Sequence, residues 1–134
     1  MRIIGPFGLL MLTFVLHTHA QDSISRRIIF IGDAGEINHK QETIIPRAAE
    51  LIIPGKTTAI FLGDNIYPKG MGLPGSPEEA ETQQILRSQF EPMRARGAPV
   101  YFIPGNHDWD RMGKNGLAKI RAQDFFLRSQ GDSL

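Results

Sequence analysis

Three apolar runs of this sequence each end beside a glycine that is followed by a polar side chain. Each run is short and rich in β-branched or aromatic residues, which predicts a strand buried in a parallel sheet. The carboxyl ends of parallel strands meet at one edge of an open α/β sheet, so we expect the three polar side chains to lie near one another. The three junctions are Gly32-Asp33 after residues 26–31, Gly63-Asp64 after residues 57–62 and Gly105-Asn106 after residues 99–103.

The segment between the first two runs has helical spacing. Within residues 39–53, Ile44, Ala48 and Leu51 share one apolar face. Pro46 predicts either a helix start or a kink in this segment, because proline lacks an N–H and clashes with the preceding turn.

Two further helices are predicted later in the chain. The first begins at residues 76–79, where Ser, Pro and Glu occupy the cap, first and third positions, and it carries an apolar stripe of Leu86, Phe90 and Met93. The second covers residues 116–128, with Asn115 as its cap and with Leu117, Ile120, Leu127 and Phe125 or Phe126 as its apolar residues. Three strands alternating with three helices predict an α/β fold.

A loop rich in proline and glycine precedes the second predicted helix. Residues 68–77 hold three prolines and three glycines, which excludes a regular helix or strand. Because this loop directly follows Asp64, it is either the rim of a substrate pocket or an insertion without a function.

The first twenty residues predict a secretory signal peptide. Arg2 gives a positive start, residues 3–16 are almost wholly apolar, and Thr18 and Ala20 are small residues suited to a cleavage site. The apolar stretch of about 14 residues is shorter than the roughly 20 that a spanning helix needs, so no stable membrane anchor is expected. We therefore expect residues 21–134 to form the mature protein, secreted or periplasmic.

Charge and composition exclude some classes of partner and site. Removal of Arg2 with the signal peptide leaves 14 basic and 14 acidic residues. A net charge near zero gives no reason to expect nucleic acid or an anionic membrane as a partner. The chain has no cysteine, which excludes disulfides and thiolate metal sites.

The polar residues at the predicted strand ends have the chemistry of a metal site. Carboxylate, amide and imidazole groups together suit iron, manganese or zinc. Two such ions would hold a phosphate and activate a water molecule. An aspartate at a strand end often only turns the chain, but three such ends in one short chain, one of them beside a histidine, favour a site. The candidate residues are Asp33, Asp64, Asn106 and His107, with Asn65, Tyr67 and Asp108 close by.

The same residues resemble three motifs of a known family, the calcineurin-like metallophosphoesterases. The purple acid phosphatase branch is most similar, since it has the patterns Gly-Asp-x-Gly and Gly-Asp-Asn-x-Tyr. Most other branches have a histidine two residues after the first aspartate, where this chain has Gly35, whereas Tyr67 matches the tyrosine of the purple acid phosphatases. The matching segments are Gly32-Asp33-Ala34-Gly35, Gly63-Asp64-Asn65-Ile66-Tyr67 and Gly105-Asn106-His107-Asp108.

The resemblance implies a role for each matching residue. Asp33 would bind one metal ion, Asp64 would bridge two, Tyr67 would bind ferric iron as a phenolate, and Asn106 would bind the second ion. His107 would contact the phosphate or act as general acid, and Asp108 would orient His107. The implied cofactors are two metal ions, iron with iron, zinc or manganese. The implied reaction is attack of a metal-bound hydroxide on a small phosphate ester, an acid phosphatase activity.

The family's later histidine ligands, a lone histidine and a Gly-His-x-His motif, have no counterpart in this sequence. The resemblance therefore covers the N-terminal half of a sandwich of two sheets flanked by helices, and implies that one sheet edge and one sheet face are uncovered. We expect residues 21–134 alone to bind metal weakly and to hydrolyse little. His39 is expected at the surface, and His17 and His19 lie within the signal peptide.

Three other interpretations remain open. The chain could be a phosphodiesterase or nucleotidase of the same superfamily that uses two manganese or zinc ions. It could instead be a non-catalytic module that binds phosphate or nucleotide through backbone N–H groups, without metal. It could also be a remnant without function, which predicts poor solubility.

Overall fold

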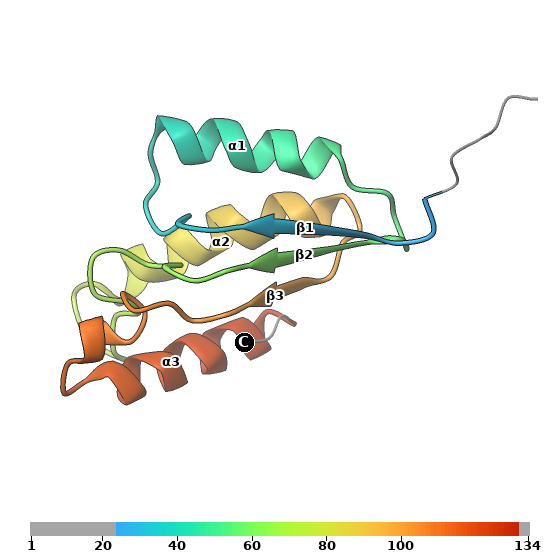
Figure 1. Ribbon diagram of the computed structural model, residues 1–134. Helices are drawn as coiled ribbons and strands as arrows, with labels where there is room; N and C mark the ends of the chain where they lie inside the picture. The colour runs from blue at the N-terminus through green and yellow to red at the C-terminus, as the bar shows by residue number, and fades with distance from the viewer. Residues whose placement is uncertain (1–23, 132–134) are drawn as a thin grey trace, which may run out of the picture.

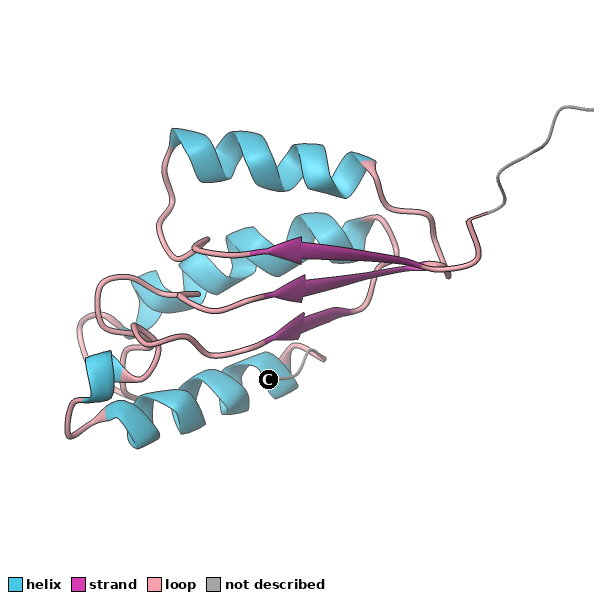
Figure 2. Cartoon of the chain, viewed as in Figure 1, coloured by secondary structure: helices cyan, strands magenta, loops and turns pink. Residues whose placement is uncertain are grey.

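A computed structural model describes residues 24–131 and shows an α/β fold, as predicted. The predicted signal peptide lies outside the described residues. Three parallel strands form one sheet in the order β1-β2-β3, and three helices alternate with them (Figures 1 and 2). The elements are β1 (Arg27–Ile31), α1 (His39–Glu50), β2 (Thr57–Phe61), α2 (Glu79–Ala95), β3 (Val100–Phe102), the short 3-10 helix η1 (Asp110–Met112) and α3 (Gly116–Ser129).

The strand order explains why the helices gather on one face of the sheet. Crossovers between parallel strands are right-handed, so two crossovers that step in the same direction place their helices on the same side. α1 and α2 make these crossovers and contact each other. α3 lies beside α2, where the Phe126 and Phe90 rings are 6.5 Å apart between centroids.

Alternate strand residues build the core beneath these helices. Ile31, Ala59, Phe61, Val100 and Phe102 are buried in one cluster with side chains of all three helices. The rings of Phe61 and Phe102 stack with centroids 4.8 Å apart, which joins β2 to β3. The predicted stripe of α2 is confirmed, since Leu86, Phe90 and Met93 are all buried in this cluster.

For the first helix, a start near Pro46 and an apolar face with Ile44 and Leu51 are wrong, and the alternative of a kink at Pro46 stays a prediction. The helix begins at His39 because the Asn38 side chain accepts hydrogen bonds from the backbone N–H groups of Lys40 and Gln41, which caps the first turn. Pro46 lies inside the helix.

The buried face of α1 consists of Gln41, Ile45 and Ala49, whereas Ile44 and Leu51 are exposed. Since Ile44 and Ile45 are adjacent, apolar spacing alone could not decide which of the two faces the sheet.

The predicted caps of α2 and α3 also differ from the structure. α2 begins at Glu79, and the Glu79 carboxylate accepts a hydrogen bond from the backbone N–H of Gly75 rather than pairing with Ser76 as a capping box. Asn115 occupies the cap position of α3 without a side-chain cap hydrogen bond. In α3, Phe126 and Leu127 are buried and Leu117 is exposed.

The face of the sheet opposite the helices is apolar and open. Ile28, Phe30, Leu62, Tyr101 and Ile103 are between 45% and 58% exposed, and they occupy alternate positions on or directly after neighbouring strands. This agrees with the expectation of one uncovered sheet face. No described helix is both long enough and apolar enough to cross a membrane.

The two sheet faces predict opposite effects of the same substitution. Phe30→Thr should change the free energy of unfolding by less than about 1 kcal/mol, because this side chain is already half in water, and it should reduce aggregation by shrinking the apolar patch. Phe61→Thr should destabilise by about 3–5 kcal/mol, because it leaves a cavity in the core. Urea denaturation and light scattering measure the two effects, and equal destabilisation by both substitutions would contradict this account of the sheet.

Candidate metal centre

The parallel register brings the three predicted junctions to one edge of the sheet. Ile31 pairs with Phe61, and Phe61 pairs with Phe102, so the strands end level with one another. Asp33 and Asp64 follow within three residues of these ends, and the Asp33 backbone N–H donates to Gly63 O at 3.2 Å. The loops that carry the candidate residues are therefore in direct contact.

Both strand-end aspartates adopt a left-handed backbone conformation. The φ angle is 54° at Asp33 and 51° at Asp64. The left-handed region is uncommon for residues other than glycine, although aspartate tolerates it better than most. The same conformation recurs in η1, where φ is 54°, 51° and 62° at residues 110, 111 and 112. Strained backbone of this kind clusters at functional sites, where surrounding contacts maintain it.

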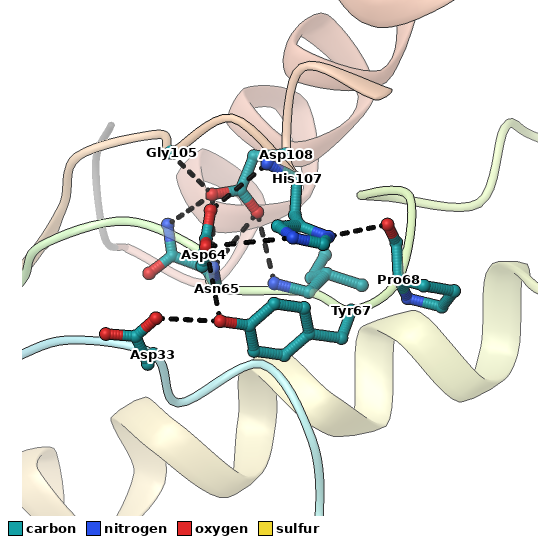
Figure 3. A network of polar contacts seen from close by, with 9 residues as sticks. Asp33, Asp64, Asn65, Tyr67, Pro68, Gly105, His107 and Asp108 are labelled. Carbon is teal, nitrogen blue, oxygen red and sulfur yellow. Dashed lines mark hydrogen bonds and ion pairs between the residues drawn. The ribbon is translucent and has the colours of Figure 1, made fainter. Parts of the chain in front are cut away.

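The Tyr67 hydroxyl lies between the two carboxylates. It donates to Asp33 Oδ1 at 2.7 Å and is 3.2 Å from Asp64 Oδ2 (Figure 3). Three oxygen atoms from the β1-end and β2-end loops thus converge around one proton. Sequence spacing grouped these residues correctly, although it gave no distance between them.

The surroundings of Tyr67 strongly favour its neutral form. Burial raises the pKa of the Tyr67 phenol, and so do its hydrogen bond to Asp33 and the negative charge of Asp64. A positive ion placed among these oxygens would have the opposite effect, since it favours the phenolate.

A backbone carbonyl orients His107. The ring nitrogen Nδ1 lies 2.7 Å from Pro68 O, and Nε2 lies 4.0 Å from Asp64 Oδ2 (Figure 3). Because a carbonyl oxygen only accepts hydrogen bonds, this contact assigns the proton to Nδ1 and turns Nε2 toward the carboxylates. The Tyr67 ring meets the His107 ring edge-on at 4.5 Å between centroids.

The expectation that Asp108 orients His107 is wrong. The Asp108 carboxylate is fully buried and accepts backbone hydrogen bonds from Gly105 at 2.7 Å and from Asn65 and Ile66 at 3.1 Å. Asp108 therefore fastens the β2-end loop to the β3-end loop. In the other direction, the His107 backbone N–H donates to Asp64 Oδ1 at 3.1 Å.

Burial dominates the ionisation of Asp108. Desolvation raises its pKa, and the hydrogen bonds from Gly105, Asn65 and Ile66 offset this only in part. The negative charge of Asp64 raises the pKa further. The carboxylate is consequently held by donors in a place that disfavours its charge, which makes this contact sensitive to substitution.

Two supporting groups, the Gln89 side chain and the Pro68 carbonyl, were not predicted from the sequence, whereas Asn65 was. Asn65 is fully buried, with its Nδ2 donating to Ile103 O at 2.9 Å, and Gln89 Nε2 donates to Asn65 O at 2.8 Å. The position of Gln89 next to Phe90 in the buried stripe of α2 was the available signal. No sequence signal pointed to the Pro68 carbonyl, because every residue has a backbone carbonyl group.

The loop at residues 68–77 packs tightly against the site. Met71 belongs to the core, and a Cβ atom at Gly70 would collide with the backbone of Asp108. Residues 67–70, 72 and 73 line a cavity of about 400 Å³ together with α2 and Lys119. The loop therefore forms a rim beside Tyr67.

Two other predicted residues lie apart from this network. Within residues 24–131, no hydrogen bond of the Asn106 side chain is found, and the residue is exposed at the edge of the site. His39 is exposed at the start of α1, as expected.

The residues present suit a metal ion through their oxygen atoms. In the described part of the chain, no group of three or more His, Cys, Asp or Glu side chains is placed to hold a metal ion. Asp33 and Asp64 supply two carboxylates, and the Tyr67 phenol is the third oxygen within hydrogen-bonding distance of them. Such an all-oxygen donor set fits a hard cation.

Substitution of Asp108 tests its role as a fastener between loops. Asp108→Asn should destabilise the fold by about 2–3 kcal/mol, because the new amide group would face backbone N–H donors and leave them unpaired. Asp110→Asn is the matched control. It removes only a 3.9 Å ion pair with Lys119, and its cost should stay below about 1 kcal/mol. Chemical denaturation measures both, and similar values for the two variants would refute the assignment.

Comparison with known proteins agrees with the geometry at the superfamily level. Searches of curated proteins and of solved structures found no significant match. The family model of the calcineurin-like phosphoesterases matches residues 26–131, which include every candidate residue described above. The chain belongs to the calcineurin-like phosphoesterase family.

Proposed function

We propose that the protein is a metal-dependent hydrolase of small phosphate esters, of the purple acid phosphatase type. The family suggests metal-dependent hydrolysis of phosphate esters. The observation that supports the finer assignment is the Tyr67 hydroxyl, which lies 2.7 Å from Asp33 and 3.2 Å from Asp64. A phenol in this position gives the donor set an oxygen ligand that ferric iron favours.

Four side chains would hold two metal ions, iron with iron, zinc or manganese. Asp33 and Tyr67 would bind the first ion, Asp64 would bridge both, and Asn106 would bind the second. When bound, such ions lower the pKa of a coordinated water molecule and neutralise the charge of the phosphate. The Asn106 side chain is exposed beside His107 in the same loop.

His107 would deliver a proton to the leaving group. Its Nδ1–H donates to Pro68 O, so the ring keeps one orientation while Nε2 gains or loses a proton. In the cationic form, Nε2–H would transfer its proton to the alkoxide oxygen as the P–O bond breaks. The neutral imidazole that results still carries the Nδ1 proton, and the Pro68 contact persists throughout.

The surrounding hydrogen bonds would keep Asp64 and His107 in fixed positions relative to each other. Asp64 Oδ1 accepts from the His107 backbone N–H at 3.1 Å, which sets the distance between the bridging carboxylate and the proton donor. Asp108 joins the same two loops a second time. Positioning of this kind matters because small displacements of reacting groups cost large factors in rate.

The two tyrosines of the chain provide a direct test of the ferric assignment. The protein loaded with ferric iron should show a visible phenolate-to-iron absorption band. Tyr67→Phe should abolish this band, and Tyr101→Phe, on the open sheet face, should retain it. A band that survives Tyr67→Phe, or a wild-type protein that binds iron without a band, would refute the tyrosine-ferric centre.

The dependence of the rate on the leaving group tests the role of His107. His107→Ala should slow hydrolysis of alkyl phosphates by about 10²–10⁴-fold, the usual contribution of a general acid. Esters with a good phenolic leaving group need little proton donation and should lose much less. His39→Ala is the matched control and should leave both rates unchanged. Equal losses for the two classes of ester would show that His107 binds phosphate rather than donating a proton.

A further inference from the structure

The loop after β1 accepts hydrogen bonds from both the backbone and the phenol of Tyr67. The backbone N–H of Tyr67 donates to Gly35 O at 2.8 Å, and its phenol hydroxyl donates to Asp33 Oδ1 at 2.7 Å. The position of the phenol therefore depends on how closely residues 33–35 approach residues 64–67.

Gly35 leaves no room for a side chain at this approach. A Cβ atom at this position would lie 2.5 Å from Asp64 O, 2.7 Å from Ile66 N and 2.8 Å from Tyr67 N. All three are backbone atoms, so no side chain can rotate away to relieve the collision. Gly35 is not among the glycines with positive φ, and its importance is therefore the close approach rather than a special backbone conformation.

Gly32, in the same turn, is free of these constraints. No atom lies within 4 Å of a Cβ built there, and its φ is not in the left-handed region. The two glycines thus differ only in whether the β2-end loop lies against them, which makes Gly32 a matched control.

We propose that Gly35 is a positioning residue that places the Tyr67 phenol between Asp33 and Asp64. The proposal deepens the function proposed above, in which this phenol is a metal ligand.

The size of the collision indicates how far Tyr67 would move. Ordinary van der Waals contact begins at 3.4 Å, so the 2.5 Å approach to Asp64 O must open by about 0.9 Å when a Cβ is added. A shift of the backbone that carries Tyr67 would lengthen and weaken the 2.7 Å hydrogen bond between Tyr67 and Asp33.

The experiment compares Gly35→Ala with Gly32→Ala in the metal-free protein. Both are made in a Tyr101→Phe background, which leaves Tyr67 as the single tyrosine. NMR then measures the cross-peak between the Tyr67 and His107 rings, which are 4.5 Å apart between centroids. Circular dichroism checks that each variant is folded. Gly35→Ala should weaken the cross-peak while folded, because its intensity falls steeply with distance, and Gly32→Ala should retain the full intensity.

The outcomes bear on the proposal independently of activity. A cross-peak of undiminished intensity in Gly35→Ala, or one that weakens equally in Gly32→Ala, overturns it. If Gly35→Ala does not fold, amide exchange in the unsubstituted protein decides. A Tyr67 amide as protected as those of β2 supports the contact with Gly35 O, and rapid exchange overturns it.

Iron loading separates this proposal from the proposed function. The phenolate-to-iron band should be lost in Gly35→Ala and kept in Gly32→Ala. A wild-type protein that has the ring cross-peak but no band would refute the ferric centre and still support the positioning role of Gly35. A band of undiminished intensity in folded Gly35→Ala would overturn the positioning role and leave the ferric centre supported.

Discussion

The Asp108 carboxylate is the contact on which the candidate site depends most. Backbone N–H groups from Gly105, Asn65 and Ile66 converge on it, so one buried side chain joins the loops that follow β2 and β3. A second link joins the same two loops, because the Asp64 carboxylate accepts a hydrogen bond from the backbone N–H of His107. Because of these two links, neither loop can move without displacing both the Asp64 carboxylate and the His107 imidazole.

The strands and the grouping at the sheet edge could be predicted from the sequence, because both follow from short-range patterns. Apolar runs that end at Gly-Asp specify a strand and the polar residue after it, and parallel order then brings Asp33 and Asp64 together. The helical faces were harder, since Ile44 and Ile45 offer equivalent spacing and only tertiary packing selects Ile45. The Asn38 cap decided where α1 begins, and it outweighed the expectation drawn from Pro46.

The contacts that orient the site were beyond prediction for a different reason. The orientation of His107 by Pro68 O, and the fastening of loops by Asp108, both use backbone atoms that have no residue-specific signature. A carboxylate next to a histidine gives the same pattern in the sequence whether it pairs with that ring or with a distant backbone. Tertiary structure decides whether the carboxylate pairs with the ring or with a distant backbone, and here the Asp108 side chain is buried in the interior.

Several features of the site cost free energy, although hydrogen bonds offset part of the cost. Asp33 and Asp64 lie in a left-handed conformation, two carboxylates lie close to one phenol, and Asp108 is buried where its charge is disfavoured. The backbone conformation and the buried charge are the costly features, whereas the hydrogen bonds from Tyr67 and from the backbone are favourable. A cation among the three oxygens would reverse the electrostatic part, since it attracts both carboxylates and stabilises a phenolate at Tyr67. The features that cost free energy thus lie at the groups whose charge a cation would offset.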